Sequence, residues 1–333
     1  MDLSHRLFPG PALLIALAAV AAIACGGADG ETPVEEINLA TYAGSDSALV
    51  YIAEQEGFFA DNGVHVTLQE YEAGKLAADA LLAGETDIAT TADFVFVSNS
   101  LEQDGLRILG TVAQSETIEL VARRDRGISN PADLRGKKIG VTRKSSGEFH
   151  LGTFLTFSGL SLSDVEVVDL NPSELIDAVS RGEIDAAFTR GLNVFEIKQA
   201  LGDTALAWPG QNGQFFYFLL LANETFVGER PEATARFLRA LEQAADFTRA
   251  NDEAAKQFVE QKFGYEAAYL DAIWQKHDFV VSLPQAMLLV LEDQARWRIE
   301  SGLTEATRVP NFLDYLYLEG LEAVAPEAVT IIR

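Results

Sequence analysis

Two segments of this chain share one pattern, and that repeat limits the fold more than any other feature. Residues 80–89 read ALLAGETDIA, and residues 178–187 read AVSRGEIDAA. In each segment a helix pattern ends at a glycine, and an acidic turn then leads into a short apolar strand. Each segment also follows a strand pattern and a helix pattern, which predicts two lobes of related construction, each an open α/β sheet. Chance similarity is the alternative, because many α/β folds contain such junctions.

Strand and helix patterns alternate along the rest of the chain. Strand patterns occur at 37–42, 64–71, 87–90, 106–113, 118–123, 137–142, 165–170, 184–189, 203–208 and 215–222. Helix patterns occur at 46–57, 75–83, 92–103, 146–157, 173–180, 232–249, 257–263 and 285–301. Ser45 and Ser146 are the expected N-caps of the helices that begin beside them. This β-α-β order favours parallel sheets flanked by helices, which is an α/β fold.

A short apolar segment lies near the N-terminus. The run at 11–23 has 13 residues, which is too short to span a bilayer but suits a signal peptide. The chain's single cysteine follows, and Ala22-Ile23-Ala24-Cys25 resembles the lipobox of bacterial lipoproteins, although Leu is commoner in place of Ala22. We therefore predict a lipoprotein signal peptide at 1–24, a lipid anchor on Cys25 and a flexible tether at 25–36. An ordinary secretory peptide that leaves a free cysteine is the alternative.

The charge balance and the residue inventory exclude several classes of function. Lys and Arg total 25 against 50 Asp and Glu, a net charge of −25, which argues against a nucleic-acid-binding protein. One cysteine permits no disulfide within the chain and no thiolate metal cluster. No two histidines have metal-ligand spacing, and no Gly-x-Ser-x-Gly or phosphate-loop motif occurs. We therefore expect no enzyme activity, metal or cofactor, and we expect His150 to be the one histidine near a ligand.

Four motifs connect the chain to a known family. They are AEQEGFFADNGVHV at 53–66, ALLAGETDIA at 80–89, ISNPADLRGKKIGV at 128–141 and AVSRGEIDAA at 178–187. Together they resemble the solute-binding proteins of ABC importers that handle aliphatic sulfonates, taurine, nitrate and thiamine pyrimidine precursors. The resemblance covers nearly all of residues 36–320. It is specific for the family and its fold but not for the ligand.

The resemblance implies an architecture and a set of partners. It implies the periplasmic-binding-protein type II fold, with lobe one at 37–121 plus 218–333, lobe two at 122–217, and a hinge of two strands near 119–124 and 215–221. It also implies a small-molecule ligand between the lobes, an ABC permease with its ATPase, an extracytoplasmic location and a monomer. A thiamine-pyrimidine synthase of the same fold is an alternative, although such enzymes carry a cysteine-rich motif that this chain lacks. A ligand-binding sensor domain is a further alternative, but such domains usually continue into a membrane helix.

Ligands of such folds lie at the carboxyl ends of strands and the helix starts that follow them. This rule selects the candidate ligand-binding residues Tyr42, Ser45, Asp46, Gly74, Thr91, Asp93 and Tyr217 in or near lobe one, and Ser145, Ser146, Gly147, Arg190 and Asn193 in lobe two. The start of the helix at Ser145–Gly147, helped by Arg190, is expected to hold an anionic group.

Each of these candidates also has a plainer interpretation. Ser146 could serve only as an N-cap, and Arg190 could pair with a surface acid at the rim. Asp46 and Asp93 could compensate helix dipoles or contact an amine or aminopyrimidine. Arg190 also stands where many relatives carry a Trp-x-Pro-like segment. Because of this departure, the resemblance does not identify the ligand.

Overall fold

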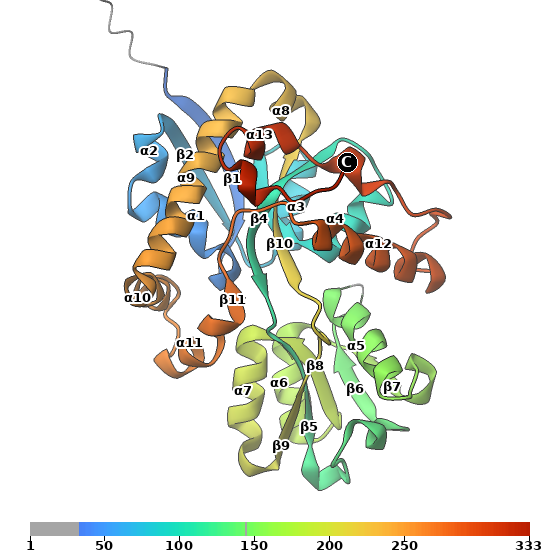
Figure 1. Cartoon of the computed structure of the whole chain (residues 1–333). Coiled ribbons are helices and arrows are strands. Elements are labelled where there is room, and N and C mark those ends of the chain that lie inside the picture. Colours follow the sequence, from blue (N-terminus) through green and yellow to red (C-terminus); the bar gives the residue numbers. More distant parts are fainter. Residues whose placement is uncertain (1–32, 144) are drawn as a thin grey trace, which may run out of the picture. The chain divides into compact units, whose positions relative to one another are not determined.

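Two β-sheets flanked by helices organise the part of the chain that the computed structural model describes, residues 33–143 and 145–333 (Figure 1). The first sheet has the order β11-β4-β10-β3-β1-β2, and the second has the order β7-β6-β8-β5-β9. The strands of the first are β1 (Glu35–Tyr42), β2 (Val64–Tyr71), β3 (Ile88–Ala92), β4 (Leu106–Ser115), β10 (Phe216–Asn223) and β11 (His277–Asp278). Those of the second are β5 (Ile118–Arg123), β6 (Lys138–Val141), β7 (Glu166–Asp169), β8 (Ala186–Arg190) and β9 (Ala205–Pro209).

The two sheets are built alike, as the repeat predicts. In the first, β1 pairs in parallel with β2 and β3, and β10 is antiparallel to β3. In the second, β6 pairs in parallel with β7 and β8, and β5 is antiparallel to β8. Gly84 and Gly182, the glycines of the two repeated segments, both have a φ of 73°, a left-handed conformation that favours glycine after a helix.

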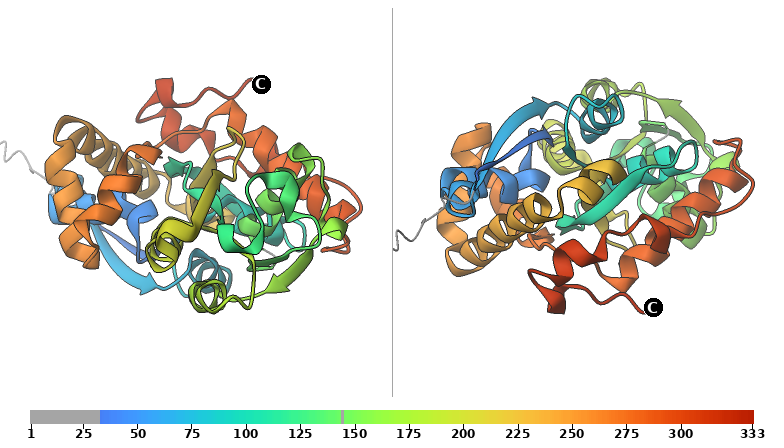
Figure 2. Two further views of the ribbon diagram at one scale, coloured as in Figure 1. Left: turned by 90° about the horizontal axis from the view of Figure 1, so that it is seen from below. Right: turned by 90° about the horizontal axis from the view of Figure 1, so that it is seen from above.

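Helices cover both sheets. Those of the first lobe are α1 (Ala48–Gln55), α2 (Phe58–Asp61), α3 (Gly74–Leu82), α4 (Asp93–Ser100), α8 (Glu224–Glu229), α9 (Pro231–Ala250), α10 (Asp252–Phe263), α11 (Ala267–Ile273), α12 (Gln285–Glu300) and α13 (Leu318–Glu322). Those of the second lobe are α5 (Ser146–Phe157), α6 (Pro172–Arg181) and α7 (Gly191–Leu201). Figure 2 shows the helices of the two lobes from below and from above. Within the described residues, no helix combines the length and the apolar character that a membrane span needs.

The chain passes between the lobes at 116–117 and at 210–215, which corrects the predicted boundaries. β5 pairs in the second sheet and β10 in the first, so residues 118–121 belong to lobe two and residues 216–217 to lobe one. An alternating apolar pattern identifies a strand but does not say which sheet the strand joins. The Gln211 side chain ties the two passages together, because its Oε1 accepts from Ile118 N at 2.9 Å and its Nε2 donates to the Ser115 carbonyl at 2.8 Å.

Two predicted helix caps are wrong, one by two residues and the other by one. Ser45 lies inside a 3-10 turn, Ser45–Ser47, and α1 begins only at Ala48. Ser145, not Ser146, caps α5, since its Oγ accepts from Gly147 N at 3.1 Å. Neighbouring serines have equal capping propensity, so the sequence could not choose between them. The predicted signal peptide at 1–24, the lipid anchor on Cys25 and most of the tether at 25–36 lie outside the described residues.

Candidate functional site

An ion pair joins the two lobes at the carboxyl ends of β1 and β8. Asp46 follows β1, and its Oδ2 accepts a hydrogen bond from Arg190 Nη1 at 2.5 Å. The Asp46 side chain is 3% exposed and that of Arg190 is 31% exposed. The pair is thus largely shielded from water, which strengthens the attraction but makes loss of either partner costly.

Hydroxyl groups place Asp46 at this position. Thr90 on β3 accepts a hydrogen bond from Tyr42 N at 2.9 Å, and its Oγ1 lies 3.2 Å from the hydroxyl oxygens of both Thr41 and Ser47. These bonds fix the end of β1 and the 3-10 turn that carries Asp46. The position of the carboxylate therefore depends on two neighbouring parallel strands.

His277 is a third member of the cluster, and no sequence motif marks it. Its Nε2 lies 3.3 Å from Asp46 Oδ1, and its Nδ1 lies 3.0 Å from the Ile273 carbonyl. A carbonyl only accepts, so Nδ1 carries a hydrogen. The short strand β11, which pairs with β4 through His277 and Ser115, brings this distant residue to Asp46. The expectation that His150 is the one histidine near a ligand stays a prediction, and the histidine that lies against the predicted site residue Asp46 is His277.

Charge and aromatic rings hold the pair together. Burial alone would raise the pKa of Asp46, but Arg190 and His277 outweigh burial and hold that pKa well below its usual range. The Arg190 guanidinium lies 4.6 Å from the centre of the Phe216 ring and 6.0 Å from that of Tyr42. These distances allow cation–π attraction. Burial raises the pKa of Tyr42, so its hydroxyl keeps its proton.

A second buried acid, Asp93, stands at the start of α4. It is 0% exposed, and it accepts hydrogen bonds from Tyr217 N at 3.0 Å and from Phe94 N at 2.6 Å. Burial raises its pKa to about 6, although these hydrogen bonds oppose the shift. Burial, followed by the neighbouring Asp93 charge, raises the pKa of Tyr217 to about 12. The two acids therefore differ: Asp46 has the Arg190 guanidinium as a partner, and Asp93 accepts from two backbone N–H groups and lies near Gln294.

The remaining predicted residues occupy several places. Ser145 is the α5 cap and donates to the Thr142 carbonyl at 2.6 Å, and Ser146 is buried beside it. Gly74 packs against β3, where a Cβ would lie 3.0 Å from Thr91 Cα. Thr91 is fully buried, and its Oγ1 has no hydrogen-bond partner among the described residues. Asn193 links α7 to α6 by donating to the Pro172 carbonyl at 2.8 Å.

The predicted anion pocket is only partly assembled. Within the described residues, no hydrogen bond connects Arg190 with Ser145, Ser146 or Gly147. Arg190 instead turns to Asp46 in the other lobe. A Cβ at Gly147 would lie 3.2 Å from Ser145 Oγ and 3.3 Å from Val141 Cγ2, so this position favours glycine for steric reasons.

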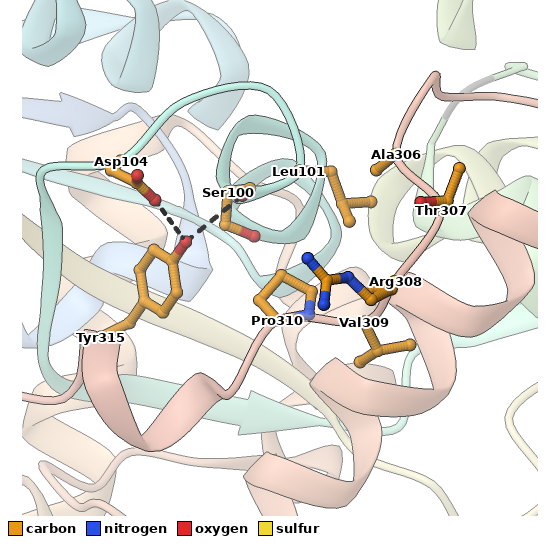
Figure 3. A pocket seen from close by; sticks show the side chains of 9 residues that line it. All are labelled: Ser100, Leu101, Asp104, Ala306, Thr307, Arg308, Val309, Pro310 and Tyr315. Carbon is orange, nitrogen blue, oxygen red and sulfur yellow. Dashed lines mark hydrogen bonds between the residues drawn. The ribbon is translucent and has the colours of Figure 1, made fainter.

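A cavity of about 490 Å³ lies elsewhere, where α4 ends (Figure 3). It is bordered by Ser100, Asp104, Arg308 and Tyr315, and the Tyr315 hydroxyl hydrogen-bonds to Asp104 Oδ1 at 3.0 Å. All of its lining residues belong to the first lobe. A ligand there would not contact the second lobe, so this cavity is a weaker candidate than the interlobe cluster for a ligand that closes the lobes.

Comparison with known proteins agrees with this architecture. Residues 45–255 match the model of a protein family described as NMT1/THI5 like. A Haemophilus influenzae protein described as a thiamine biosynthesis protein is 30% identical over 232 residues, which cover 68% of this chain and 73% of that protein. The taurine-binding periplasmic protein of Escherichia coli is 26% identical over 193 residues, which cover 57% of this chain and 59% of that protein.

The solved structures agree on the fold. The periplasmic aliphatic sulphonate binding protein SsuA from Escherichia coli matches with a TM-score of 0.75 at 16% identity, covering 85% of this chain and 92% of that one. The two-sheet architecture is therefore the fold of periplasmic binding proteins.

Proposed function

The chain belongs to the NMT1/THI5-like family, and we propose that it is the extracytoplasmic solute-binding component of an ABC importer. It would capture a small anionic or zwitterionic solute, such as a sulfonate, taurine or nitrate, between its lobes and deliver it to a permease. The observation that carries this proposal is the cluster of Asp46, Arg190 and His277, in which charged groups from both lobes meet. A solute that contacts both lobes would favour the closed arrangement over an open one.

The site residues predicted from the sequence remain part of this proposal. The start of α5 at Ser145–Gly147 offers backbone N–H groups to an acidic group of the solute. Asp46 and Arg190 would have to part for a solute to contact either of them, and a zwitterion could pair with both. The remaining candidates would line the space between the strand ends.

A second candidate function concerns thiamine pyrimidine precursors. The Haemophilus influenzae relative, described as a thiamine biosynthesis protein, favours a solute or product of that class. A buried acid with a raised pKa, such as Asp93, could accept a hydrogen bond from an aminopyrimidine. Binding of a precursor without turnover would identify a transport protein, and formation of a new pyrimidine product would identify an enzyme.

A thermal-unfolding screen of the full chain tests the proposed function. The panel is taurine, ethanesulfonate, nitrate, bicarbonate and a thiamine pyrimidine precursor. A cognate solute at 100 times its dissociation constant should add about 2.7 kcal/mol of stability, because it binds only the folded state. If no member of the panel raises the unfolding temperature, the proposed solute classes are wrong.

Lipid anchoring is tested separately at Cys25. We predict that Cys25→Ser releases the protein from the membrane fraction, because the lipid chains would be its only attachment. Fractionation followed by mass spectrometry of the mature N-terminus measures this. A wild-type protein that is wholly soluble with an unmodified N-terminus would contradict the prediction.

A further inference from the structure

A row of aromatic rings connects the lobes at the place where α4 and α12 of the first lobe contact α5 of the second. Figure 1 shows where these three helices lie. The Phe94 ring lies 6.2 Å from Phe149 and 5.9 Å from Trp297, and Phe149 lies 5.8 Å from Trp297. We call these three residues the aromatic seam. Gly152 lets α5 approach α12, since a Cβ there would lie 3.2 Å from Trp297 Nε1. Separation of the lobes would therefore open this seam.

Arg298 lies against the seam and has a buried charge without an acidic partner. It is 4% exposed, and its guanidinium lies 5.4 Å from the centre of the Phe94 ring. Its Nη2 donates to the Leu303 carbonyl at 3.1 Å, whereas its Nε has no hydrogen-bond partner among the described residues. Within that part of the chain, no carboxylate oxygen lies within 4.0 Å of it. Burial lowers its pKa, and Glu102 and Glu148 act on it only from a greater distance.

Arg298 and Arg190 therefore differ in a way that matters for anion binding. Arg190 already has the Asp46 carboxylate at 2.5 Å, so an incoming anion must compete with a fixed one. Arg298 contacts a backbone carbonyl and a ring, and Glu102 and Glu148 act on it only from a greater distance. An anion would therefore meet less competition at Arg298 than at Arg190. A buried cation without a counter-ion destabilises the folded protein. Stabilisation of the fold therefore does not explain Arg298.

Two more polar side chains near the seam lack partners. Gln294, one turn before Arg298 on α12, is 0% exposed. Neither its Oε1 nor its Nε2 has a hydrogen-bond partner within 3.5 Å in the described part of the chain, although its side chain lies near enough to Asp93 to lower the pKa of that acid. Both ring nitrogens of His150, which follows Phe149 on α5, are likewise buried without a hydrogen-bond partner among the described residues. Burial lowers the pKa of His150 to about 4, so at neutral pH its ring offers one donor and one acceptor. Buried polar groups are normally paired, and these together suggest a missing ligand.

We propose that Arg298 and Gln294 hold the acidic group of the solute, facing the start of α5, while the aromatic seam contacts the rest of the solute. The solute class is a small organic oxyanion, a sulfonate or a carboxylate, attached to an aromatic or other apolar group. This inference rests on the proposed function and makes Arg298, instead of Arg190, the guanidinium of the anion site. Closure of the lobes then brings the α5 N–H groups onto the same anion.

The test uses thermal unfolding and titration calorimetry of the full chain with benzenesulfonate, benzoate and ethanesulfonate. The variants are Arg298→Met and Gln294→Met, and Arg296→Met, an exposed arginine on the same helix, is the matched control. We expect benzenesulfonate or benzoate to bind wild type and Arg296→Met more tightly than ethanesulfonate does. We expect Arg298→Met to weaken that binding at least tenfold and, without ligand, to unfold at the same or a higher temperature.

The outcomes separate this inference from the proposed function. Equal affinity of Arg298→Met and wild type for the bound anion overturns the inference and leaves the proposed function intact. If Arg298→Met does not fold, Gln294→Met decides: tenfold weaker binding with an unchanged unfolding temperature supports the inference, and unchanged binding overturns it. If ethanesulfonate or taurine binds wild type while the aryl anions do not, the proposed function stands and the solute class inferred here is wrong. If none of the three anions binds wild type, the inference fails, and the thermal-unfolding screen with the full solute panel decides the proposed function.

Discussion

Replacing Asp46 by asparagine should destabilise the protein by on the order of 3 kcal/mol at pH 7, because breaking a buried ion pair leaves its partner uncompensated. The substitution keeps the size of the side chain but removes the charge that faces Arg190 and His277. The pKa of Asp46 is held below its usual range in the folded state. Its contribution is therefore present above the unfolded pKa of 3.8 and is lost as the pH falls further. Urea unfolding at pH 7 and at pH 3 measures both effects.

Two variants serve as controls for this prediction. Asp79→Asn removes an exposed helix pair with Lys75, and it should cost less than about 0.5 kcal/mol. The double variant Asp46→Asn/Arg190→Met should be more stable than the sum of its single changes predicts, since it leaves no unpaired guanidinium. If Asp46→Asn is as stable as wild type at pH 7, the Asp46–Arg190 pair contributes nothing to the free energy of unfolding.

Replacing Asp93 by asparagine should change stability with pH in the opposite direction from Asp46→Asn. Burial raises the pKa of Asp93 from 3.8 to about 6, so its contribution to stability is fully present below 3.8 and is lost as the pH rises through about 6. Two pKa units correspond to roughly 3 kcal/mol. We therefore expect the stability of Asp93→Asn relative to wild type to rise by about 1–3 kcal/mol between pH 4 and pH 7.5. The amide has one acceptor oxygen where the carboxylate has two, so either Phe94 N or Tyr217 N loses its partner, which costs about 1–3 kcal/mol at every pH.

The pH dependence is the decisive readout for Asp93. Urea unfolding of wild type and Asp93→Asn at several values between pH 4 and pH 7.5 should give a difference that grows with pH. A difference that does not change with pH would mean that Asp93 has an ordinary pKa. A gain in stability accompanied by weaker solute binding would indicate that the buried charge is retained for function.

The sequence predicted the architecture well because its signals were local. The repeated segments at 80–89 and 178–187 place a left-handed glycine between a helix and a strand in each lobe, and apolar periodicity identified the strands. The lobe boundaries were wrong by several residues because β5 and β10 are assigned to a sheet only by pairing across long separations. Local patterns contain no information about that pairing.

The candidate site was harder to predict for the same reason. Asp46 and Arg190 could be selected because Asp46 follows the end of one strand and Arg190 is the last residue of another. His277 stands on the two-residue strand at the edge of the sheet, and Arg298 lies in the last turn of an ordinary helix. Neither position has a motif, and only the packing of α4, α5 and α12 shows that Arg298 is buried without an acid.

The central claim is that a solute closes the two lobes on each other, and the distance between the lobes tests it most directly. Spin labels at Asp246→Cys on α9 and Asp177→Cys on α6, in a Cys25→Ser background, would sit on exposed positions of the two lobes. Pulsed electron resonance should give a broad distance distribution without solute. With each panel solute that raises the unfolding temperature, it should give a single narrower distribution. An identical distribution with and without a saturating solute would contradict the account.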